Sequence, residues 1–230
     1  NDVTVDSIWT MLEYKLEKFD GKKIAIIGAG NIGSKLALKL TESGCNVVIY
    51  RRDTYKGHLI SQALNIIKPH STIACVQYVD NIHKACFLAD VVIGTTNGVP
   101  VINSSHLKGS AKGVTCIDAG KGTFTSDAVS YLSSKKINIY RADITSRIYS
   151  EIASILHYNK VALQNCGAAD FDDIRLVSGG ILGKEGDIVV DCYKNISQIY
   201  GVADGKGDFK KCLSAKDKYR LEKVKSYFSL

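Results

Sequence analysis

Residues 23–33 read Lys-Ile-Ala-Ile-Ile-Gly-Ala-Gly-Asn-Ile-Gly (KIAIIGAGNIG). The stretch begins with the short apolar run Ile24–Ile27, bounded by glycine, which is typical of a buried strand. A glycine loop of the form G-x-G-x-x-G follows, and a helical pattern of apolar residues begins at Ile32. A strand, this loop and a helix, in that order, are the context in which the motif binds the pyrophosphate of a dinucleotide.

Each position of the loop has a physical task in such a site. Gly28 permits a tight turn, Gly30 lets the backbone approach the pyrophosphate, and Gly33 lets the helix pack against the strand. Asn31 and Ile32 open the helix, whose first N–H groups and positive dipole end face the phosphates. We therefore expect these five residues to contact the cofactor.

The same alternation of short apolar runs and helical patterns continues along the chain. Strands are expected at 23–27, 46–50, 72–76, 90–94, 114–117 and 137–140, and helices at 5–19, 32–40, 59–67, 81–88, 127–134 and 146–163. Buried strands that alternate with helices predict an α/β fold with a doubly wound, mainly parallel Rossmann sheet.

The pattern also predicts three parts of the chain. Residues 1–20 would form a helix that packs on the core, residues 21–165 the NAD(P)-binding Rossmann domain, and residues 166–230 a small Gly-rich C-terminal β/α appendage. The appendage shows short β-like runs and ends in a basic helix. Gly179, Gly180 and Gly183 within it fit hairpin turns, with a second anion-holding loop as the alternative.

The residues after the second expected strand bear on which dinucleotide binds. An NAD site needs a carboxylate at the end of that strand for the ribose 2′-OH. Here Tyr50 is followed by Arg51 and Arg52, whose guanidinium groups match a phosphate and keep their charge. The sequence therefore favours NADP, and NAD remains the alternative if the strand extends to Asp53.

Polar residues follow the later strands, where ligands of this fold bind. The fourth strand is followed by Thr95, Thr96 and Asn97, which we expect to contact the nicotinamide ribose. The candidates nearest the nicotinamide ring are Asp118, Lys121 and Asp143. Lys121 could donate a proton to a carbonyl oxygen as hydride arrives, or bind a carboxylate. For all three, a loop-capping or solvated role is the alternative.

Composition narrows the class of protein. The 230 residues are 45% hydrophobic and 23% charged, which argues against disorder, and the net charge of +7 suits a small anionic substrate. No apolar stretch reaches the length of a membrane span. Seven cysteines without a C-x-x-C pair favour the reducing cytoplasm, and the five scattered histidines do not predict a metal site.

The basic C-terminal segment is the one feature that suggests nucleic acid. Residues 204–230 carry eight Lys or Arg against four Asp or Glu. Aromatic residues interleaved with the basic ones on a binding face would be needed, and they are not evident. We therefore expect no nucleic-acid partner.

Residues 20–122 resemble the NAD(P)-binding domains of the amino-acid-dehydrogenase-like group, which includes methylenetetrahydrofolate dehydrogenase, shikimate dehydrogenase and glutamyl-tRNA reductase. The resemblance rests on Gly21–Gly30, Ala89–Gly98, Cys116–Gly120, and Tyr50–Thr54, which is similar to the Asn-Arg-Thr turn of shikimate dehydrogenases. It implies a Rossmann fold and an Arg on the NADP 2′-phosphate. In these families a separate N-terminal domain supplies much of the catalytic equipment, so we expect such a domain to be missing from this chain or absent from the protein.

Two functions are consistent with the sequence. The first is an NAD(P)-dependent oxidoreductase, or its cofactor-binding domain, that acts by hydride transfer on a small anionic substrate. The second is a non-catalytic dinucleotide-binding regulatory or sensor module, which would bind the cofactor without turnover. Rossmann oxidoreductases are often homodimers, so a homodimer is a further expectation.

Overall fold

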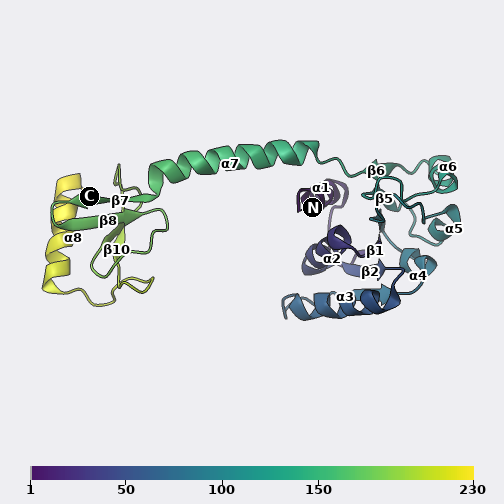
Figure 1. Ribbon diagram of the computed structural model, residues 1–230, viewed down its shortest axis with the longest axis horizontal. Coiled ribbons are helices and arrows are strands. Elements are labelled where there is room, and N and C mark those ends of the chain that lie inside the picture. The colour runs from purple at the N-terminus through teal and green to yellow at the C-terminus, as the bar shows by residue number, and fades with distance from the viewer. Residues whose placement is uncertain (1) are drawn as a thin grey trace. The chain divides into compact units, whose positions relative to one another are not determined.

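The computed structural model describes residues 2–230, apart from the side chains of residues 146, 163 and 164. Residue 1, the start of the expected N-terminal segment, lies outside the described residues. The chain divides into two compact units, one up to Ile148 and the other Tyr149–Leu230. Helix α7 (Thr145–Asn165) runs across this division, whereas the sequence predicts a boundary at 165/166 (Figure 1).

The first unit is built on a six-stranded sheet in the order β3-β2-β1-β4-β5-β6. Every pair of neighbouring strands is parallel. The strands are β1 (Lys23–Ile27), β2 (Asn46–Tyr50), β3 (Val76–Val79), β4 (Val91–Gly94), β5 (Thr115–Asp118) and β6 (Ile139–Arg141). The expected doubly wound parallel Rossmann sheet is confirmed. Its order reverses between β1 and β4, where ligands of this fold bind.

Helices cover both faces of this sheet (Figure 1). The helices are α1 (Asp2–Lys15), α2 (Asn31–Glu42), α3 (Thr54–Ile67), α4 (Ile82–Cys86), α5 (Ser104–Leu107) and α6 (Ser126–Ser134). Ile24 and Ile26 of β1 belong to the apolar core with α1, α2 and α3, and Ala25 and Ile27 belong to the core with α4, α5 and α6. Successive residues of a strand point to opposite faces, so a strand buried on both sides needs a continuous apolar run.

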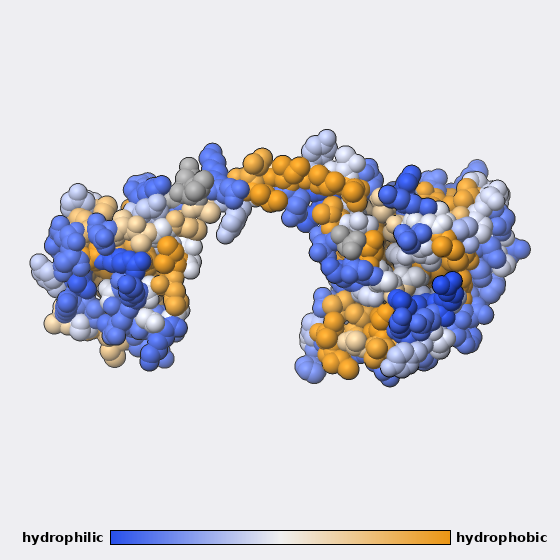
Figure 2. Space-filling model, viewed as in Figure 1, coloured by the Kyte–Doolittle hydropathy of each residue, from blue (hydrophilic) through white to orange (hydrophobic). Residues whose placement is uncertain are grey.

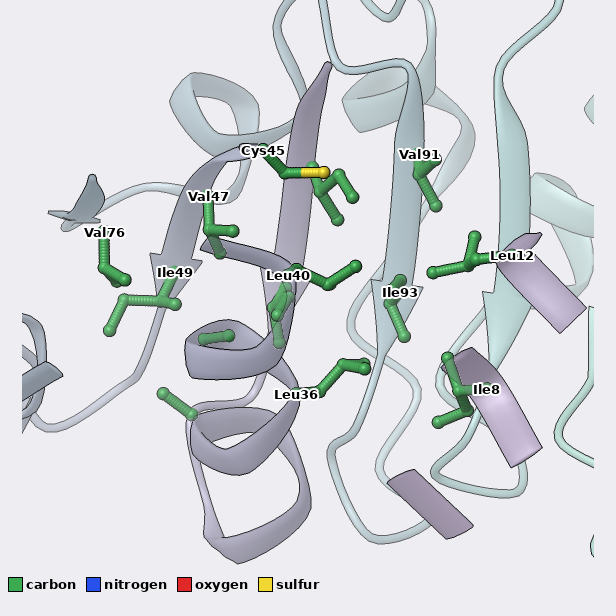
Figure 3. Close-up of a cluster of buried hydrophobic side chains, with 14 of the residues drawn as sticks. Ile8, Leu12, Leu36, Leu40, Cys45, Val47, Ile49, Val76, Val91 and Ile93 are labelled. Atoms are coloured by element: carbon green, nitrogen blue, oxygen red, sulfur yellow. The ribbon is translucent and has the colours of Figure 1, made fainter. Parts of the chain in front are cut away.

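The core under α1 and α2 holds the glycine loop's helix in place. Leu36 and Leu40 of α2 are fully buried beside Ile93 of β4, and Ile8 and Leu12 of α1 complete the cluster (Figure 3). Burying one such side chain stabilises the fold by about 1.5–3 kcal/mol. The N-terminus of α2 is therefore held in place at the carboxyl end of the central strand β1.

Three expected elements differ from the structure by four residues or more. The helix expected at 59–67 begins five residues earlier, at Thr54, where Asp53 caps it. The strand expected at 72–76 lies at Val76–Val79, because β3 is an edge strand in which only Val76 is buried, so it forms no continuous apolar run. The helix expected at 5–19 ends at Lys15. Phe19 lies beyond the end of this helix, but its ring stacks on that of Trp9 with 4.7 Å between the centroids. Phe19 therefore packs against the helix although its own backbone is not helical.

The side of α3 that points away from the sheet exposes four large hydrophobic side chains among polar ones. Tyr55, Leu59, Ile66 and Ile67 are each at least 52% exposed. Figure 2 shows this surface as an orange patch over α3 at the bottom of the first unit. Surfaces of this kind often mark contact sites between proteins.

The second unit is a small sheet in the order β10-β9-β8-β7 with α8 (Ala215–Phe228). The strands are β7 (Gly167–Phe171), β8 (Ile174–Ser178), β9 (Ile188–Val190) and β10 (Ile199–Val202). The β7–β8 and β9–β10 pairs are antiparallel and β8–β9 is parallel. Gly179 and Gly180, with φ of +67° and +80°, form the turn after β8.

The basic helix α8 is tied to its own unit. Ser214 and Asp217 form the capping box at its start. Arg220 contacts Asp173 at 3.1 Å and Lys223 contacts Asp172 at 2.7 Å, both in the β7–β8 turn. Part of the positive charge of the C-terminal segment is therefore neutralised within the unit. Across residues 2–230, no helix has the length and apolar character needed to cross a membrane.

Candidate cofactor and substrate site

The three glycines of the loop do different things. A Cβ on Gly28, which has φ +111°, would lie 2.9 Å from the carbonyl of Thr95, and a Cβ on Gly33 would lie 2.4 Å from Gly28 O. A Cβ on Gly30 would meet nothing within 4 Å. Gly28 and Gly33 are therefore required by packing of the protein itself, whereas Gly30 faces open space in which a pyrophosphate could approach the backbone.

The N-terminus of α2 lies beside this open side. Gly30 is the N-cap residue, no described side chain caps the helix, and its first turn carries no acidic residue. Asn31 is exposed and Ile32 is half-buried. The first N–H groups of α2 are thus available to an anion, which a helix N-terminus stabilises.

A first pocket of about 420 Å³ lies next to the loop, and we call it the glycine-loop pocket. It is lined by Gly28, Ala29, Gly30, Tyr50, Arg51, Arg52, Asp53, Thr95, Thr96, Asn97, Val99 and Val101. The structure thus brings most of the residues expected to hold the cofactor into one hollow at the carboxyl ends of β1, β2 and β4.

Arginine, not a carboxylate, follows β2 in this pocket. Arg51 is half-buried and donates a hydrogen bond to Ala29 O, while Arg52 is exposed. Asp53 is the N-cap of α3 and accepts a hydrogen bond from Lys56 N at 3.0 Å. That bond holds the pKa of Asp53 below its ordinary value. The carboxylate is therefore engaged by a helix three residues beyond the end of β2.

The segment after β4 fixes the loop by hydrogen bonds. Thr95 Oγ1 donates to Gly28 O and lies 3.2 Å from Ile27 O, and Thr96 Oγ1 donates to Val99 O at 2.6 Å. These hydroxyls hold backbone in place, and their expected contact with a nicotinamide ribose stays a prediction, as does that of Asn97. Thr95 and Asn97 also line a second pocket.

The second pocket, of about 770 Å³, lies at the carboxyl ends of β5 and β6, and we call it the β5–β6 pocket. It is lined by Thr4, Ile32, Thr95, Asn97, Asp118, Ala119, Gly120, Lys121, Arg141, Ala142, Asp143 and Ile144. All three residues expected near the nicotinamide ring are therefore in one pocket, and it shares Thr95 and Asn97 with the glycine-loop pocket.

Asp118 organises the loop that carries Lys121. Its carboxylate accepts hydrogen bonds from Gly120 N at 3.1 Å, Gly122 N at 2.6 Å, Thr123 N at 3.3 Å and Thr123 Oγ1 at 3.0 Å. Lys121 lies at the tip of this loop, exposed and in the left-handed region with φ +60°. Asp118 thus holds the loop whose Lys121 lines the pocket, and a catalytic part for either residue stays a prediction.

Asp143 is engaged in a similar way. Its carboxylate accepts a hydrogen bond from Thr145 N at 2.9 Å, at the start of α7. This bond holds the pKa of Asp143 below its ordinary value. A catalytic part for Asp143 stays a prediction.

Arg141 is a lining residue that the sequence reasoning did not single out. It is the last residue of β6, and the register of the sheet places it beside Asp118 of β5. The rule that ligands bind at the carboxyl ends of parallel strands would have selected it. Among residues 2–230, no group of three His, Cys, Asp or Glu could hold a metal ion.

Comparison with known proteins agrees with this geometry. Residues 2–164 match the family model described as "D-isomer specific 2-hydroxyacid dehydrogenase, NAD binding domain". Ketol-acid reductoisomerase (NADP(+)) 2 of Bifidobacterium longum is 46% identical over 50 residues, which are 22% of this chain and 14% of that protein. The expected nicotinamide-dinucleotide domain of an oxidoreductase family is confirmed, and the narrower amino-acid-dehydrogenase-like group is not.

Solved structures show the same fold at low identity. The dipicolinate synthase of Bacillus halodurans has a TM-score of 0.50 at 16% identity, with 67% of this chain and 53% of that chain covered. A mitochondrial ornithine carbamoyltransferase of Coccidioides immitis has a TM-score of 0.53 at 16% identity, with 67% and 55% covered. The chain thus spans about half the length of these proteins, whose names describe different activities.

Proposed function

The chain belongs to the family of NAD-binding domains of the D-isomer specific 2-hydroxyacid dehydrogenases, and from this premise we propose that it binds NADP and serves hydride transfer to a small anionic substrate. The glycine-loop pocket would hold the adenosine and pyrophosphate, and the β5–β6 pocket the nicotinamide end and the substrate. This division follows from the two pockets sharing Thr95 and Asn97 at the point where the strand order reverses.

The observation that carries the choice of NADP is the position of Arg51. It follows the last residue of β2, where a site for NAD has its carboxylate, and Asp53 is bound to the backbone of α3. A guanidinium has five N–H donors, so its hydrogen bond to Ala29 O leaves others for a 2′-phosphate. The similar reductoisomerase is itself named for NADP(+).

The residues of the β5–β6 pocket suit reduction of a carbonyl group. NADPH, when bound, supplies hydride to the carbonyl carbon. The Lys121 ammonium donates a proton to the carbonyl oxygen, so that an alcohol forms and Lys121 is left neutral until water reprotonates it. Asp118 keeps the Lys121 loop in place through its four hydrogen bonds.

A turnover assay tests this function. NADPH oxidation is followed in the presence of a panel of small 2-oxo acids, with the wild-type chain and with Lys121→Gln. We expect turnover by the wild type and a fall in kcat of about 10²-fold or more in Lys121→Gln, with NADPH affinity unchanged. Lys112→Gln removes the same charge from an exposed site outside both pockets and should change neither quantity.

The assay also separates the two hypotheses. NADPH binding without reduction of any acid in the panel would favour the non-catalytic regulatory or sensor module. Wild-type kcat in Lys121→Gln would remove Lys121 from the proton transfer.

A further inference from the structure

The charged groups of the β5–β6 pocket are not equivalent. Of its two carboxylates, Asp118 accepts four hydrogen bonds from its own loop, and Asp143 accepts one from Thr145 N. Both carboxylates therefore accept hydrogen bonds from donors of their own loops.

The two cations of the pocket are Lys121 and Arg141. Within the part of the chain that the structure describes, neither side chain has an ion pair or a hydrogen bond to another residue. Arg141 lies beside Asp118 in the sheet register, yet the Asp118 oxygens are turned to Gly120, Gly122 and Thr123. Among the described residues, Lys121 and Arg141 are thus two cations of the pocket that form no ion pair with its carboxylates.

We propose that Arg141 binds a second anionic group of the substrate, and that the substrate is therefore a small dicarboxylate. The inference rests on the proposed function, which places the substrate in this pocket and the reacting carbonyl at Lys121. The planar fork of an arginine matches a carboxylate with two parallel hydrogen bonds and cannot lose its proton. A lysine is a compact charge that can also give up a proton, which suits the end of the substrate that carries the reacting carbonyl group.

The size and position of the pocket agree with two anchored ends. A volume of about 770 Å³ exceeds what a three- or four-carbon acid needs, and it leaves room for the nicotinamide end of a cofactor. Arg141 ends β6 and Lys121 follows β5, so the cations come from neighbouring strands of a rigid sheet. The fold thereby brings both residues to the same end of the sheet.

Binding of unreactive acids tests the proposal. The full chain is saturated with NADP⁺ and titrated by calorimetry with malonate, a dicarboxylate, and with acetate, a monocarboxylate, while neutral malonamide serves as a blank. We expect malonate to bind about tenfold or more tightly than acetate. Arg141→Gln should remove this preference and leave acetate binding within about twofold of wild type.

Two further variants sharpen the result. Arg141→Lys keeps the charge but not the fork, so it should retain part of the preference for malonate. Lys112→Gln lowers the net charge equally at an exposed site outside the pocket and should keep the whole preference. Arg141 is exposed at the end of its strand, so its replacement should leave the unfolding temperature unchanged.

The outcomes that overturn the proposal are specific. Equal affinity of the wild type for malonate and acetate, or a malonate preference that survives in Arg141→Gln, would contradict it. NADP⁺ affinity is measured in the same samples. Intact NADP⁺ binding with no malonate preference contradicts the dicarboxylate substrate alone, whereas no NADP⁺ binding contradicts the proposed function as well.

Discussion

Replacing Gly30 and Gly33 separately by alanine should separate a loss of cofactor from a loss of fold. A Cβ on Gly30 meets no atom within 4 Å, and Gly30 has φ −92°, which alanine adopts without strain. A Cβ on Gly33 lies 2.4 Å from Gly28 O and 3.0 Å from Thr95 Oγ1. The first methyl group enters the open space in which we propose that the pyrophosphate binds, and the second collides with protein atoms.

The distances set the size of each effect. Contact at 3.4 Å or more is ordinary, so Gly33→Ala must push the α2 start and Gly28 O apart by about 1 Å. Gly28 O is held by Gly30 N at 2.8 Å and by Thr95, so the movement disturbs the whole loop. Such overpacking costs about 1–3 kcal/mol, a fall of roughly 2–12 °C in unfolding temperature. Gly30→Ala should stay within about 1 kcal/mol of wild type.

Thermal unfolding and NADPH fluorescence titration are the two assays. Gly30→Ala should keep its unfolding temperature within about 4 °C of wild type and bind NADPH about tenfold or more weakly. Gly109→Ala, outside both pockets and with one Cβ contact at 3.4 Å, controls for the substitution itself. NADPH affinity of Gly30→Ala equal to that of the wild type would refute the placement of the pyrophosphate, and an unchanged unfolding temperature in Gly33→Ala would refute the packing argument.

Three further predictions concern other parts of the molecule. Replacing Arg51 and Arg52 together by Gln should weaken NADPH about 10–100-fold and leave NADH within about twofold, as measured by fluorescence titration, since only the 2′-phosphate contact is lost; equal losses for both would contradict it. Hydrogen bonds from Thr125 and Ser104 lower the pKa of Asp127 from 3.8 to about 2, so its contribution to stability is present above pH 3.8 and lost as the pH falls toward 2. Acid unfolding of Asp127→Asn, followed by circular dichroism, should accordingly depend less on pH in that window, and an unchanged profile would count against it. Burial raises the pKa of the Cys86 thiol to about 12, whereas Cys75 is exposed. A thiol reagent at pH 8 should therefore label Cys75 before Cys86, as followed by mass spectrometry, and labelling of Cys86 before Cys75 would contradict this.

Local sequence patterns were enough to predict the central strand β1 and the glycine loop that follows it. The run Ile24–Ile27 is buried on both faces, so its apolar character had to be continuous, and the glycine spacing follows from the close approach of Gly33 to Gly28. The edge strand β3 and the short helix α5 carry weaker signals, because fewer of their residues are buried. Strand β7 was not expected at all, since its half-exposed Gly-Ala-Ala-Asp-Phe has no strong β pattern.

The sequence predicted which residues lie together at the strand ends, but not which hydrogen bonds their side chains make. The sequence placed Asp118, Lys121 and Asp143 together, and the structure finds them in one pocket. The hydrogen bonds of Asp118 and Asp143 agree with the loop-capping alternative, which the sequence could not decide because those bonds depend on how the loops turn. That Arg141 lacks an ion-pair partner among the described residues is seen only in the structure, where Asp118 and Asp143 accept hydrogen bonds from their own loops.

Titration of the wild-type chain with NADPH and with NADH, followed by nicotinamide fluorescence, tests the central claim most directly. The account predicts that both cofactors bind and that NADPH binds about tenfold or more tightly, because the proposed site places Arg51 and Arg52 where its 2′-phosphate would bind. Tighter binding of NADH, or binding of neither cofactor, would contradict it.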